Sequence, residues 1–297
     1  MRILVTGSSG VLGQDLCREL VDEYEVVGLD VRAARAADGR GQVADFVKID
    51  ITDRDEAIEK ISGIDPAIVI HAAAYTDVDG CELDPDRARE VNAIGTQNVA
   101  LACRGCDIPI FYLSTDFVFD GNKKAPYTES DRPNPLNIYG KSKLDGEGYV
   151  GSLLDKFLII RTSWLFGRGG KNFVDTIVDE AKRGKVLKVV NDQFGSPTYT
   201  KDLSRAIEGL INKVLAEDRI YGIYHITNGG SCSWYEFAVR ILEYSNGENV
   251  AVMPITSNEL DRPARRPKMS ILDNSRYIEL TGERLRPWSE ALREYLC

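Results

Sequence analysis

A tyrosine and a lysine four residues apart, Tyr139 and Lys143, form the pair in this chain best suited to proton transfer. If the segment is helical, the two side chains lie one turn apart on the same face. A phenol has an ordinary pKa of about 10, and a nearby ammonium favours the phenolate and lowers that pKa. The pair can therefore exchange a proton with a substrate oxygen. Because the same spacing is common among surface pairs, the interpretation depends on the elements around it.

A glycine-rich turn near the start of the chain predicts a nucleotide site. The apolar run at residues 2–6 predicts a buried strand, and the amphipathic stretch 14–22 predicts a helix. The turn between them has the spacing Gly-x-x-Gly-x-x-Gly. In a strand–turn–helix unit such glycines permit a tight turn, close approach of a pyrophosphate and close helix packing. The expected cofactor contacts here are Gly7, Ser9, Gly10, Val11, Leu12 and Gly13.

The residues after the next strands predict where the rest of a dinucleotide binds. Asp30 closes a predicted strand at 25–30, about 20 residues past the glycines, where a carboxylate can hold both ribose hydroxyls of NAD. Arg32 could instead pair with a 2′-phosphate, and Arg35 and Arg40 follow it, so NADPH and NADH both stay open. Later strands are expected at 46–49 and 67–70. The cofactor contacts expected after them are Asp50, Ile51, Ala72, Ala73, Ala74, Tyr75 and Thr76.

Strands alternate with helices through the first half of the chain. A helix is expected at 84–104, a strand at 108–113, the helix of Tyr139 from about residue 135, and a strand at 157–161. This rhythm predicts an α/β fold with a doubly wound parallel sheet of the Rossmann type. The carboxyl ends of parallel strands meet at one edge, so Thr115 and Asp116 should lie near the glycine turn.

The regular alternation of strands and helices ends after Trp164. Helices are expected at 172–183, 200–215, 233–244 and 288–296, and strands at 186–190 and 221–227. No polar linker intervenes, so we expect a dinucleotide-binding domain at 1–165 and a smaller C-terminal α/β substrate lobe at 166–297, with later segments able to return to the first. The cleft between them is the expected substrate site. The basic segment 261–270 is either a solvated loop or a diphosphate clamp.

Composition excludes several classes of protein. The chain has 297 residues and a net charge of −9, which argues against nucleic-acid and membrane-surface binding. No apolar run approaches the ~20 residues of a membrane span, and the first residues enter a strand directly, so we expect a cytoplasmic protein without a signal peptide. Six scattered cysteines indicate reduced thiols, and Cys103 and Cys106 are interpreted as incidental. With two histidines, no metal site is expected.

These motifs resemble the extended short-chain dehydrogenase/reductase family over essentially the whole chain. The glycine turn, Asn92-Ala-Ile-Gly-Thr96 and Tyr139-x-x-x-Lys143 mark the superfamily. A narrower resemblance is to its dTDP-4-dehydrorhamnose reductase branch. The segments that carry it are Ala72-Ala-Ala-Tyr-Thr-Asp-Val-Asp79, Ser114-Thr-Asp-Phe-Val-Phe119, Pro135-Leu-Asn-Ile-Tyr-Gly-Lys-Ser-Lys143, Arg161-Thr-Ser-Trp164, Asn191-Asp-Gln-Phe-Gly-Ser-Pro-Thr198 and the Arg-Pro segment near Arg262.

The resemblance implies roles for individual residues. Tyr139 is the implied catalytic acid, Lys143 its partner and the group that holds the nicotinamide ribose, and Thr115 a hydrogen-bond donor to the substrate oxygen. The implied sugar contacts are Thr115, Asp116, Trp164 and Asn172. Phe117 and Phe194 stand where this branch usually has tyrosine, so hydrogen bonds from those positions are not expected.

The implied activity is NADPH- or NADH-dependent reduction of the 4-keto group of a nucleotide-activated deoxysugar, dTDP-4-dehydro-L-rhamnose to dTDP-L-rhamnose. A homodimer is a possible assembly. Two alternatives stay open. The first is a nucleotide-sugar epimerase or dehydratase, which would not consume added NAD(P)H. The second is a non-catalytic regulatory subunit of methionine adenosyltransferase, which would bind that transferase without reducing a sugar. The intact Tyr139, Lys143 and Thr115 favour the reductase.

Overall fold

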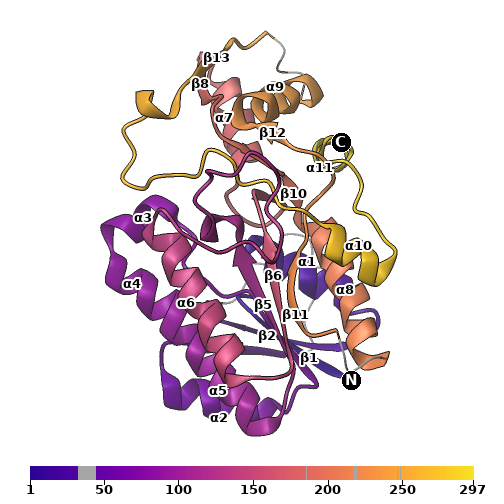
Figure 1. Ribbon diagram of the computed structural model, residues 1–297. Helices are drawn as coiled ribbons and strands as arrows, with labels where there is room; N and C mark the ends of the chain where they lie inside the picture. The colour runs from indigo at the N-terminus through magenta and orange to yellow at the C-terminus, as the bar shows by residue number, and fades with distance from the viewer. Residues whose placement is uncertain (33–44, 185, 217–219, 246, 248) are drawn as a thin grey trace.

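Seven parallel strands form the central sheet of the computed structural model, which describes residues 1–32, 45–184, 186–216, 220–245, 247 and 249–297 (Figure 1). Their spatial order is β11-β6-β5-β4-β1-β2-β3. The chain moves outward from β1 in one direction and then returns to its other side, which confirms the predicted doubly wound parallel sheet. The bounds are β1 (Arg2–Thr6), β2 (Glu25–Asp30), β3 (Asp45–Lys48), β4 (Ile68–His71), β5 (Ile110–Thr115), β6 (Phe157–Thr162) and β11 (Gly222–His225).

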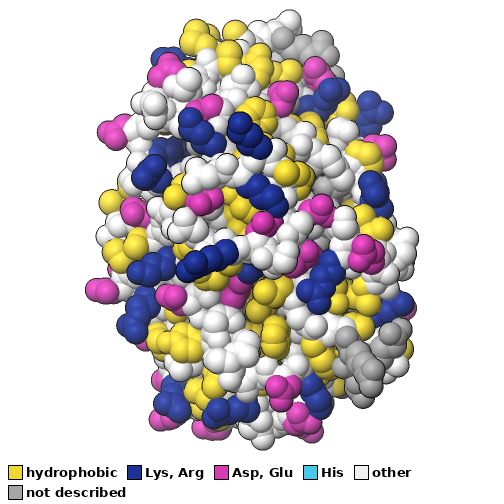
Figure 2. All heavy atoms as spheres, in the orientation of Figure 1, with side chains coloured by type: hydrophobic (Ala, Val, Ile, Leu, Met, Phe, Trp, Pro, Cys, Tyr) yellow, Lys and Arg dark blue, Asp and Glu magenta, His cyan; other side chains and the backbone are white. Residues whose placement is uncertain are grey.

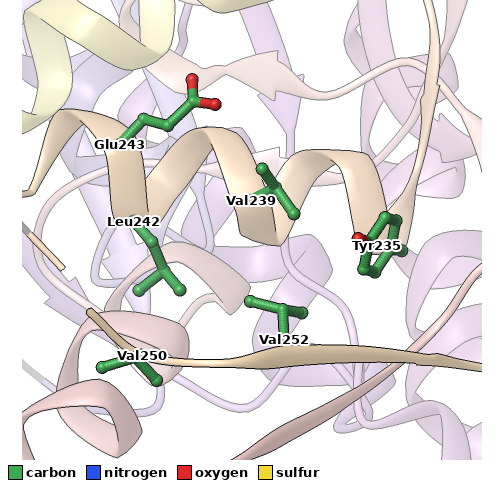
Figure 3. A pocket seen from close by; sticks show the side chains of 6 residues that line it. All are labelled: Tyr235, Val239, Leu242, Glu243, Val250 and Val252. Atoms are coloured by element: carbon green, nitrogen blue, oxygen red, sulfur yellow. The ribbon is translucent and has the colours of Figure 1, made fainter. Parts of the chain in front are cut away.

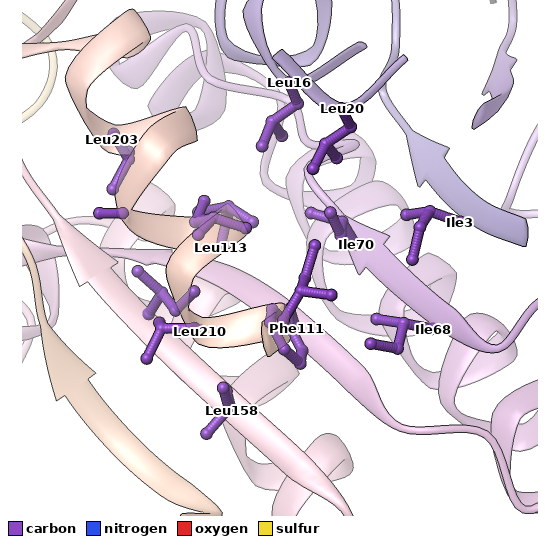
Figure 4. Close-up of a cluster of buried hydrophobic side chains, with 14 of the residues drawn as sticks. Ile3, Leu16, Leu20, Ile68, Ile70, Phe111, Leu113, Leu158, Leu203 and Leu210 are labelled. Atoms are coloured by element: carbon purple, nitrogen blue, oxygen red, sulfur yellow. The ribbon is translucent and has the colours of Figure 1, made fainter. Parts of the chain in front are cut away.

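Helices cover both faces of the sheet. Helices α1 (Val11–Leu20) and α8 (Thr200–Ala216) pack together on one face, and Figure 4 shows their leucines meeting Phe111 and Ile70. Helices α2 (Arg54–Ile64), α5 (Thr96–Cys106) and α6 (Ile138–Leu153) cover the other face. Along β5, Phe111 faces the first layer and Tyr112 the second, and both are fully buried. Burial on both faces explains the nearly continuous apolar run that predicted this strand.

The helix expected at 84–104 is interrupted. Helix α3 (Val78–Leu83) is followed by α4 (Pro85–Arg89), a π-helical segment (Glu90–Gly95) and then α5. Within the π segment Asn92 turns its amide inward, accepting a hydrogen bond from Tyr75 N at 2.7 Å and donating to Ser142 Oγ at 3.0 Å. Single π turns often occur at functional sites, and this one brings Asn92 against the helix of Tyr139.

A smaller lobe lies above the sheet in Figure 1. It has its own apolar core, built from α7 (Phe173–Lys182), α9 (Trp234–Tyr244), α11 (Trp288–Leu296) and the parallel pair β8 (Leu187–Val190) and β13 (Val252–Ile255). Short pairs β7 (Leu165–Phe166) with β10 (Thr198–Tyr199), and β9 (Phe194–Gly195) with β12 (Cys232–Ser233), connect it to the sheet. Strand β13 and helix α10 (Ser275–Thr281) were not predicted from the sequence. Because β11 and α8 rejoin the sheet, the division at residue 165 stays a prediction.

Neither a membrane-spanning helix nor a metal-binding cluster is present among the residues that the structure describes. In the described part of the chain, no helix is long and apolar enough to cross a membrane. The same residues hold no cluster of three or more metal-binding side chains, and all six cysteines are free. Acidic and basic side chains are interspersed on the face shown in Figure 2.

Candidate active site

The glycine turn is shaped by its contacts with the strands beside it. Gly7 has a φ of +68°, and a Cβ there would lie 2.6 Å from Ala73 N. A Cβ on Gly13 would lie 2.1 Å from Gly7 O, whereas one on Gly10 would meet only Gly7 O at 3.2 Å. Gly7 and Gly13 are therefore required by packing, and Gly10 leaves the start of α1 open. No side chain caps that helix, so its first N–H groups fit a pyrophosphate.

Asp30 and Arg32 lie beside this turn. The Asp30 carboxylate accepts hydrogen bonds from Ser9 N at 3.1 Å and from Arg32 N at 3.4 Å. Ser9 Oγ donates to Arg32 O at 2.6 Å, and the Arg32 side chain is exposed. Both residues therefore lie beside the glycine turn, and their expected contacts with the ribose stay a prediction. Arg35 and Arg40 fall outside the described residues.

The other expected cofactor residues follow β3 and β4 along the same edge. Asp50 is exposed in a turn, where it accepts hydrogen bonds from Thr52 N at 3.0 Å and Thr52 Oγ1 at 2.8 Å. Ile51 is buried, and a Cβ on Gly95 would lie 2.8 Å from its side chain. Three small residues, a tyrosine and a threonine follow β4, and all five are partly or fully exposed. They are Ala72, Ala73, Ala74, Tyr75 and Thr76.

Helix α6 carries Tyr139 and Lys143 one turn apart, as predicted. Its N-terminus is held from three directions. Asn137 Oδ1 accepts from Gly140 N at 2.8 Å, Glu82 Oε2 accepts from Ile138 N at 3.0 Å, and Asn137 Nδ2 donates to Arg265 O at 2.7 Å. A Cβ on Gly140 would lie 2.1 Å from Phe117 O, so glycine is needed for this close approach. The first turn of α6 is thereby fixed against the segment that follows β5.

Tyr139 meets the end of β5. Its ring meets the Phe117 ring edge-on, with the two ring centroids 5.7 Å apart. Its phenol interacts with the hydroxyl of Thr115. Burial raises the pKa of Tyr139, the Asp116 carboxylate adds to that, and Thr115 opposes it. The expected lowering of this pKa by Lys143 is therefore wrong for this structure, because desolvation dominates. A phenol that stays protonated is the form needed to donate a proton to an oxyanion.

Lys143 is 2% exposed and lies between aromatic and charged neighbours. Its Nζ sits 4.1 Å from the ring centroid of Tyr112, a cation–π contact. Burial lowers the pKa of Lys143 to about 7, and Glu147 one turn further along α6 opposes that shift. His71 is buried nearby with a pKa lowered to about 3, mainly by burial and then by Lys143, so it is neutral. No chemistry was expected of His71, and its two ring nitrogens both contact threonine hydroxyls.

A buried ion pair beneath these residues joins α6 to the sheet. Arg161 on β6 donates to the two oxygens of Glu147 at 2.9 and 2.6 Å. Ser114 Oγ also donates to Glu147, and His225 Nε2 lies 3.5 Å from the guanidinium. Arg161 and Glu147 are 2% and 5% exposed. Glu147 was not predicted as a site residue, although its spacing of four residues from Lys143 was an available signal.

Thr115 and Asp116, the expected contacts of the substrate, lie next to each other at the end of β5. Thr115 Oγ1 donates to Asp116 Oδ1 at 3.1 Å and accepts from Phe117 N at 3.1 Å. Burial raises the pKa of Asp116 to about 7, partly offset by the hydroxyls of Ser270 and Thr115. Asp116 Oδ2 and Thr162 Oγ1 are buried without a hydrogen-bond partner among the described residues. Thr162 was also missed, since only the strand register reveals that it neighbours Thr115.

Trp164 leads from β6 into the smaller lobe. Its φ of 48° lies in the left-handed region, which non-glycine residues rarely occupy and which recurs at active sites. Its ring stacks on Trp234 with centroids 3.5 Å apart and planes 7° apart. A Cβ on Gly195 would lie 2.4 Å from the Trp164 ring, so glycine makes room for this stack.

Asn172 caps helix α7. Its Oδ1 accepts from Asp175 N at 3.1 Å, and its Nδ2 contacts Gly167 O at 2.9 Å and Tyr295 Oη at 3.2 Å. These contacts use both ends of the amide, which gives Asn172 a structural role here. Its expected contact with the sugar stays a prediction.

The basic segment 261–270 joins the two halves of the molecule. Arg266 forms a two-point ion pair with Asp79 on α3, at 2.7 Å each. Lys268 O accepts from Phe194 N at 2.8 Å on the side of the smaller lobe. Asn137 Nδ2, at the N-cap of α6, also donates to Arg265 O. We call segment 261–270 a strap because these bonds tie it to α3, to α6 and to the smaller lobe. Arg262 and Arg265 remain exposed on it.

A separate hollow of about 450 Å³ lies in the smaller lobe, between α9 and the strand β13 (Figure 3). None of the expected site residues lines it. The residues that line it are Tyr235, Val239, Leu242, Glu243, Val250 and Val252. The residues expected to transfer a proton therefore lie at the sheet edge and not in this hollow.

Known proteins that resemble this chain share its whole length. The family model described as the RmlD substrate binding domain matches residues 1–297. The spore coat polysaccharide biosynthesis protein SpsK of Bacillus subtilis is 42% identical over 99% of this chain and 96% of its own length. The dTDP-4-dehydrorhamnose reductase of Aggregatibacter actinomycetemcomitans is 38% identical over 98% of this chain and 97% of its own.

A solved structure agrees with the sequence comparisons. The dTDP-4-dehydrorhamnose reductase of Bacillus anthracis, in complex with NADP, has a TM-score of 0.88 and 40% identity, covering 99% of this chain and 98% of that one. The family model, the two relatives and the solved structure each match 98% or more of this chain. The second relative and the solved structure carry the name of the branch that the motifs resemble. The chain therefore belongs to the family described as the RmlD substrate binding domain, in its dTDP-4-dehydrorhamnose reductase branch.

Proposed function

We propose that the protein reduces the 4-keto group of dTDP-4-dehydro-L-rhamnose to give dTDP-L-rhamnose, using NADPH or NADH. The observation that carries this proposal is the meeting of Tyr139 with Thr115 at the carboxyl end of β5, on the edge that also holds the open glycine turn. Relatives named for this reaction at 38% identity, and a related structure holding NADP, support the choice of substrate and cofactor.

The chain supplies binding, orientation and a proton. When bound, the nicotinamide supplies the hydride. The uncapped start of α1 holds the pyrophosphate, and Asp30 or Arg32 contacts the adenosine ribose. Tyr139 donates its phenolic proton to the sugar oxygen as negative charge develops there, and Thr115 hydrogen-bonds the same oxygen.

Lys143 and Asp116 complete the proposed machinery. The Lys143 ammonium lies on the same helical face as Tyr139 and holds the ribose next to the nicotinamide. At 2% exposure its access to water is small, so the ribose hydroxyls of a bound cofactor would serve as its hydrogen-bond acceptors. Asp116 and Trp164 contact the sugar from the ends of β5 and β6. A homodimer and a cytoplasmic location remain predictions.

The test is turnover by the purified protein. With NADPH or NADH and dTDP-4-dehydro-L-rhamnose, we expect loss of the absorbance of reduced nicotinamide, with one cofactor oxidised for each sugar reduced. Turnover of other keto-sugars but not this one would overturn the substrate assignment. Sugar conversion without net cofactor oxidation would instead indicate an epimerase or dehydratase, and capture of methionine adenosyltransferase without any turnover would indicate the regulatory alternative.

A further inference from the structure

Two buried oxygens at the candidate site lack hydrogen-bond partners among the residues that the structure describes. They are Asp116 Oδ2 and Thr162 Oγ1. Asp116 is 1% exposed and Thr162 is 4% exposed. An unpaired buried polar atom costs free energy, so native proteins have few of them. Neighbouring hydroxyls at the same strand ends are satisfied: Ser114 Oγ donates to Glu147 and Ser163 Oγ to Ser196 O. The lack of partners is therefore specific to Asp116 and Thr162.

The strand register places both atoms beside Thr115. Thr162 on β6 is the direct partner of Thr115 on β5, and neighbouring parallel strands lie about 4.8 Å apart. Register partners project to the same face, so Thr162 and Thr115 stand side by side. Asp116 follows Thr115 and accepts a hydrogen bond from its hydroxyl through Oδ1. The Ser270 hydroxyl also acts on this carboxyl group, but Oδ2 has no hydrogen-bond partner among the described residues. The two unpaired atoms thus flank the place where Thr115 and Tyr139 meet.

The position favours the sugar over the cofactor as the partner. In the sheet, β6 lies on the far side of β5 and β4 from β1, which carries the glycine turn. Two residues after Thr162 comes Trp164, stacked on Trp234 of the smaller lobe. A threonine hydroxyl and a carboxyl group can each donate and accept, which matches a ring hydroxyl.

We propose that Thr162 Oγ1, together with Asp116 Oδ2, hydrogen-bonds a ring hydroxyl of the sugar next to the carbon that is reduced. The neighbour of C4 that carries a ring hydroxyl is C3, so Thr162 is then a specificity-determining residue that selects sugars with a hydroxyl at C3. This inference rests on the proposed function, because it takes a keto-sugar as the substrate.

Thr162→Val is the sharpest test, since it removes only the hydroxyl and keeps a β-branched side chain suited to a strand. Thr227→Val is the matched control. Thr227 is 1% exposed, but its hydroxyl is paired, accepting from Asn274 Nδ2 at 3.1 Å. The wild type and both variants are assayed with the proposed substrate and with its 2-deoxy and 3-deoxy analogues. Melting temperatures are measured alone, with NADPH, and with dTDP-L-rhamnose.

We expect opposite signatures from the two variants. Thr162→Val should keep or raise the melting temperature of the free protein, because it removes an unpaired buried group. It should lower kcat/KM for the hydroxylated substrate about 10- to 100-fold and abolish the preference over the 3-deoxy analogue, while the preference over the 2-deoxy analogue is kept. Its stabilisation by dTDP-L-rhamnose should shrink, while that by NADPH is unchanged. Thr227→Val should lower the melting temperature by about 2 °C and leave the preference intact.

Two results would overturn the inference. An unchanged preference in Thr162→Val would show that its hydroxyl does not face the sugar, as would a bound water that satisfies it in the complex. A selective loss of NADPH stabilisation would assign the hydroxyl to the cofactor. If the wild type turns over no keto-sugar, the proposed function fails, and the melting shift with dTDP-L-rhamnose still shows whether Thr162 contacts a nucleotide sugar.

Discussion

The buried Glu147–Arg161 pair should be the most sensitive charge pair at the site. Removing one partner of a buried ion pair leaves the other charge desolvated and unpaired, which typically costs about 3–5 kcal/mol. The 2% and 5% exposure of these residues and the two short bonds between them place the pair in that class. Glu147→Gln should therefore remove about 3–5 kcal/mol from a total of roughly 5–15 kcal/mol.

The assay is urea unfolding followed by circular dichroism, with an exposed pair as the control. Lys182 and Asp179 lie 3.3 Å apart with side chains 71% and 65% exposed, so Asp179→Asn should cost less than about 1 kcal/mol. The double variant Glu147→Met with Arg161→Met should recover much of the lost stability, because no buried charge remains unpaired. A cost below about 1 kcal/mol for Glu147→Gln would refute this reasoning.

The same substitution should change the pH dependence of cofactor binding. Burial lowers the pKa of Lys143 to about 7, and Glu147 is the group that raises it. Glu147→Gln should lower that pKa further. Since the ammonium form is proposed to hold the ribose, binding weakens as pH rises through the pKa, and in the variant this loss should begin at a lower pH. An unmoved alkaline limb in NADPH titrations would contradict the role of Lys143.

Three further substitutions test separate parts of the site. Tyr139→Phe should lower kcat about 10²- to 10⁴-fold with cofactor affinity little changed, and near-normal turnover would remove the phenol from proton transfer. Trp164→Phe keeps a ring against Trp234, so it should raise KM for the nucleotide sugar with little change in melting temperature; an unchanged KM would place Trp164 outside the substrate site. Asp30→Ala should shift kcat/KM toward NADPH and Arg32→Ala toward NADH, and a constant ratio in both would show that neither faces the adenosine ribose.

The fold was largely predictable because its signals are local. Strands buried on both faces appear as short apolar runs, and the glycine turn between β1 and α1 fixes the first βα unit. The irregular parts were not predictable by the same means. The π segment depends on the long-range bonds of Asn92 to Tyr75 and Ser142, which no local pattern encodes. Strand β13 is a four-residue edge strand with largely exposed side chains and little alternation.

The site shows the same division. Tyr139 and Lys143 could be chosen from their types and spacing, and Thr115 from the family resemblance. Thr162 could not, since its place beside Thr115 follows from strand register alone. The direction of the Tyr139 pKa shift was also mispredicted, because spacing along a helix shows the charge but not the burial that outweighs it. The contacts of segment 261–270 were not predictable either, because the ion pair between Arg266 and Asp79 joins residues far apart in the sequence. This pair holds the strap against α3, so the segment is not a free loop.

The central claim is that hydride passes from the nicotinamide to C4 of a dTDP-linked keto-sugar while Tyr139 supplies the proton. The most direct measurement uses NADPH deuterated at the transferred position of C4, with dTDP-4-dehydro-L-rhamnose as substrate and NMR of the sugar product. The account predicts one deuterium at C4 of dTDP-L-rhamnose for each NADPH oxidised, formed at a rate that Tyr139→Phe lowers at least about 10²-fold. Product without deuterium at C4, or deuterium at another carbon, would contradict it.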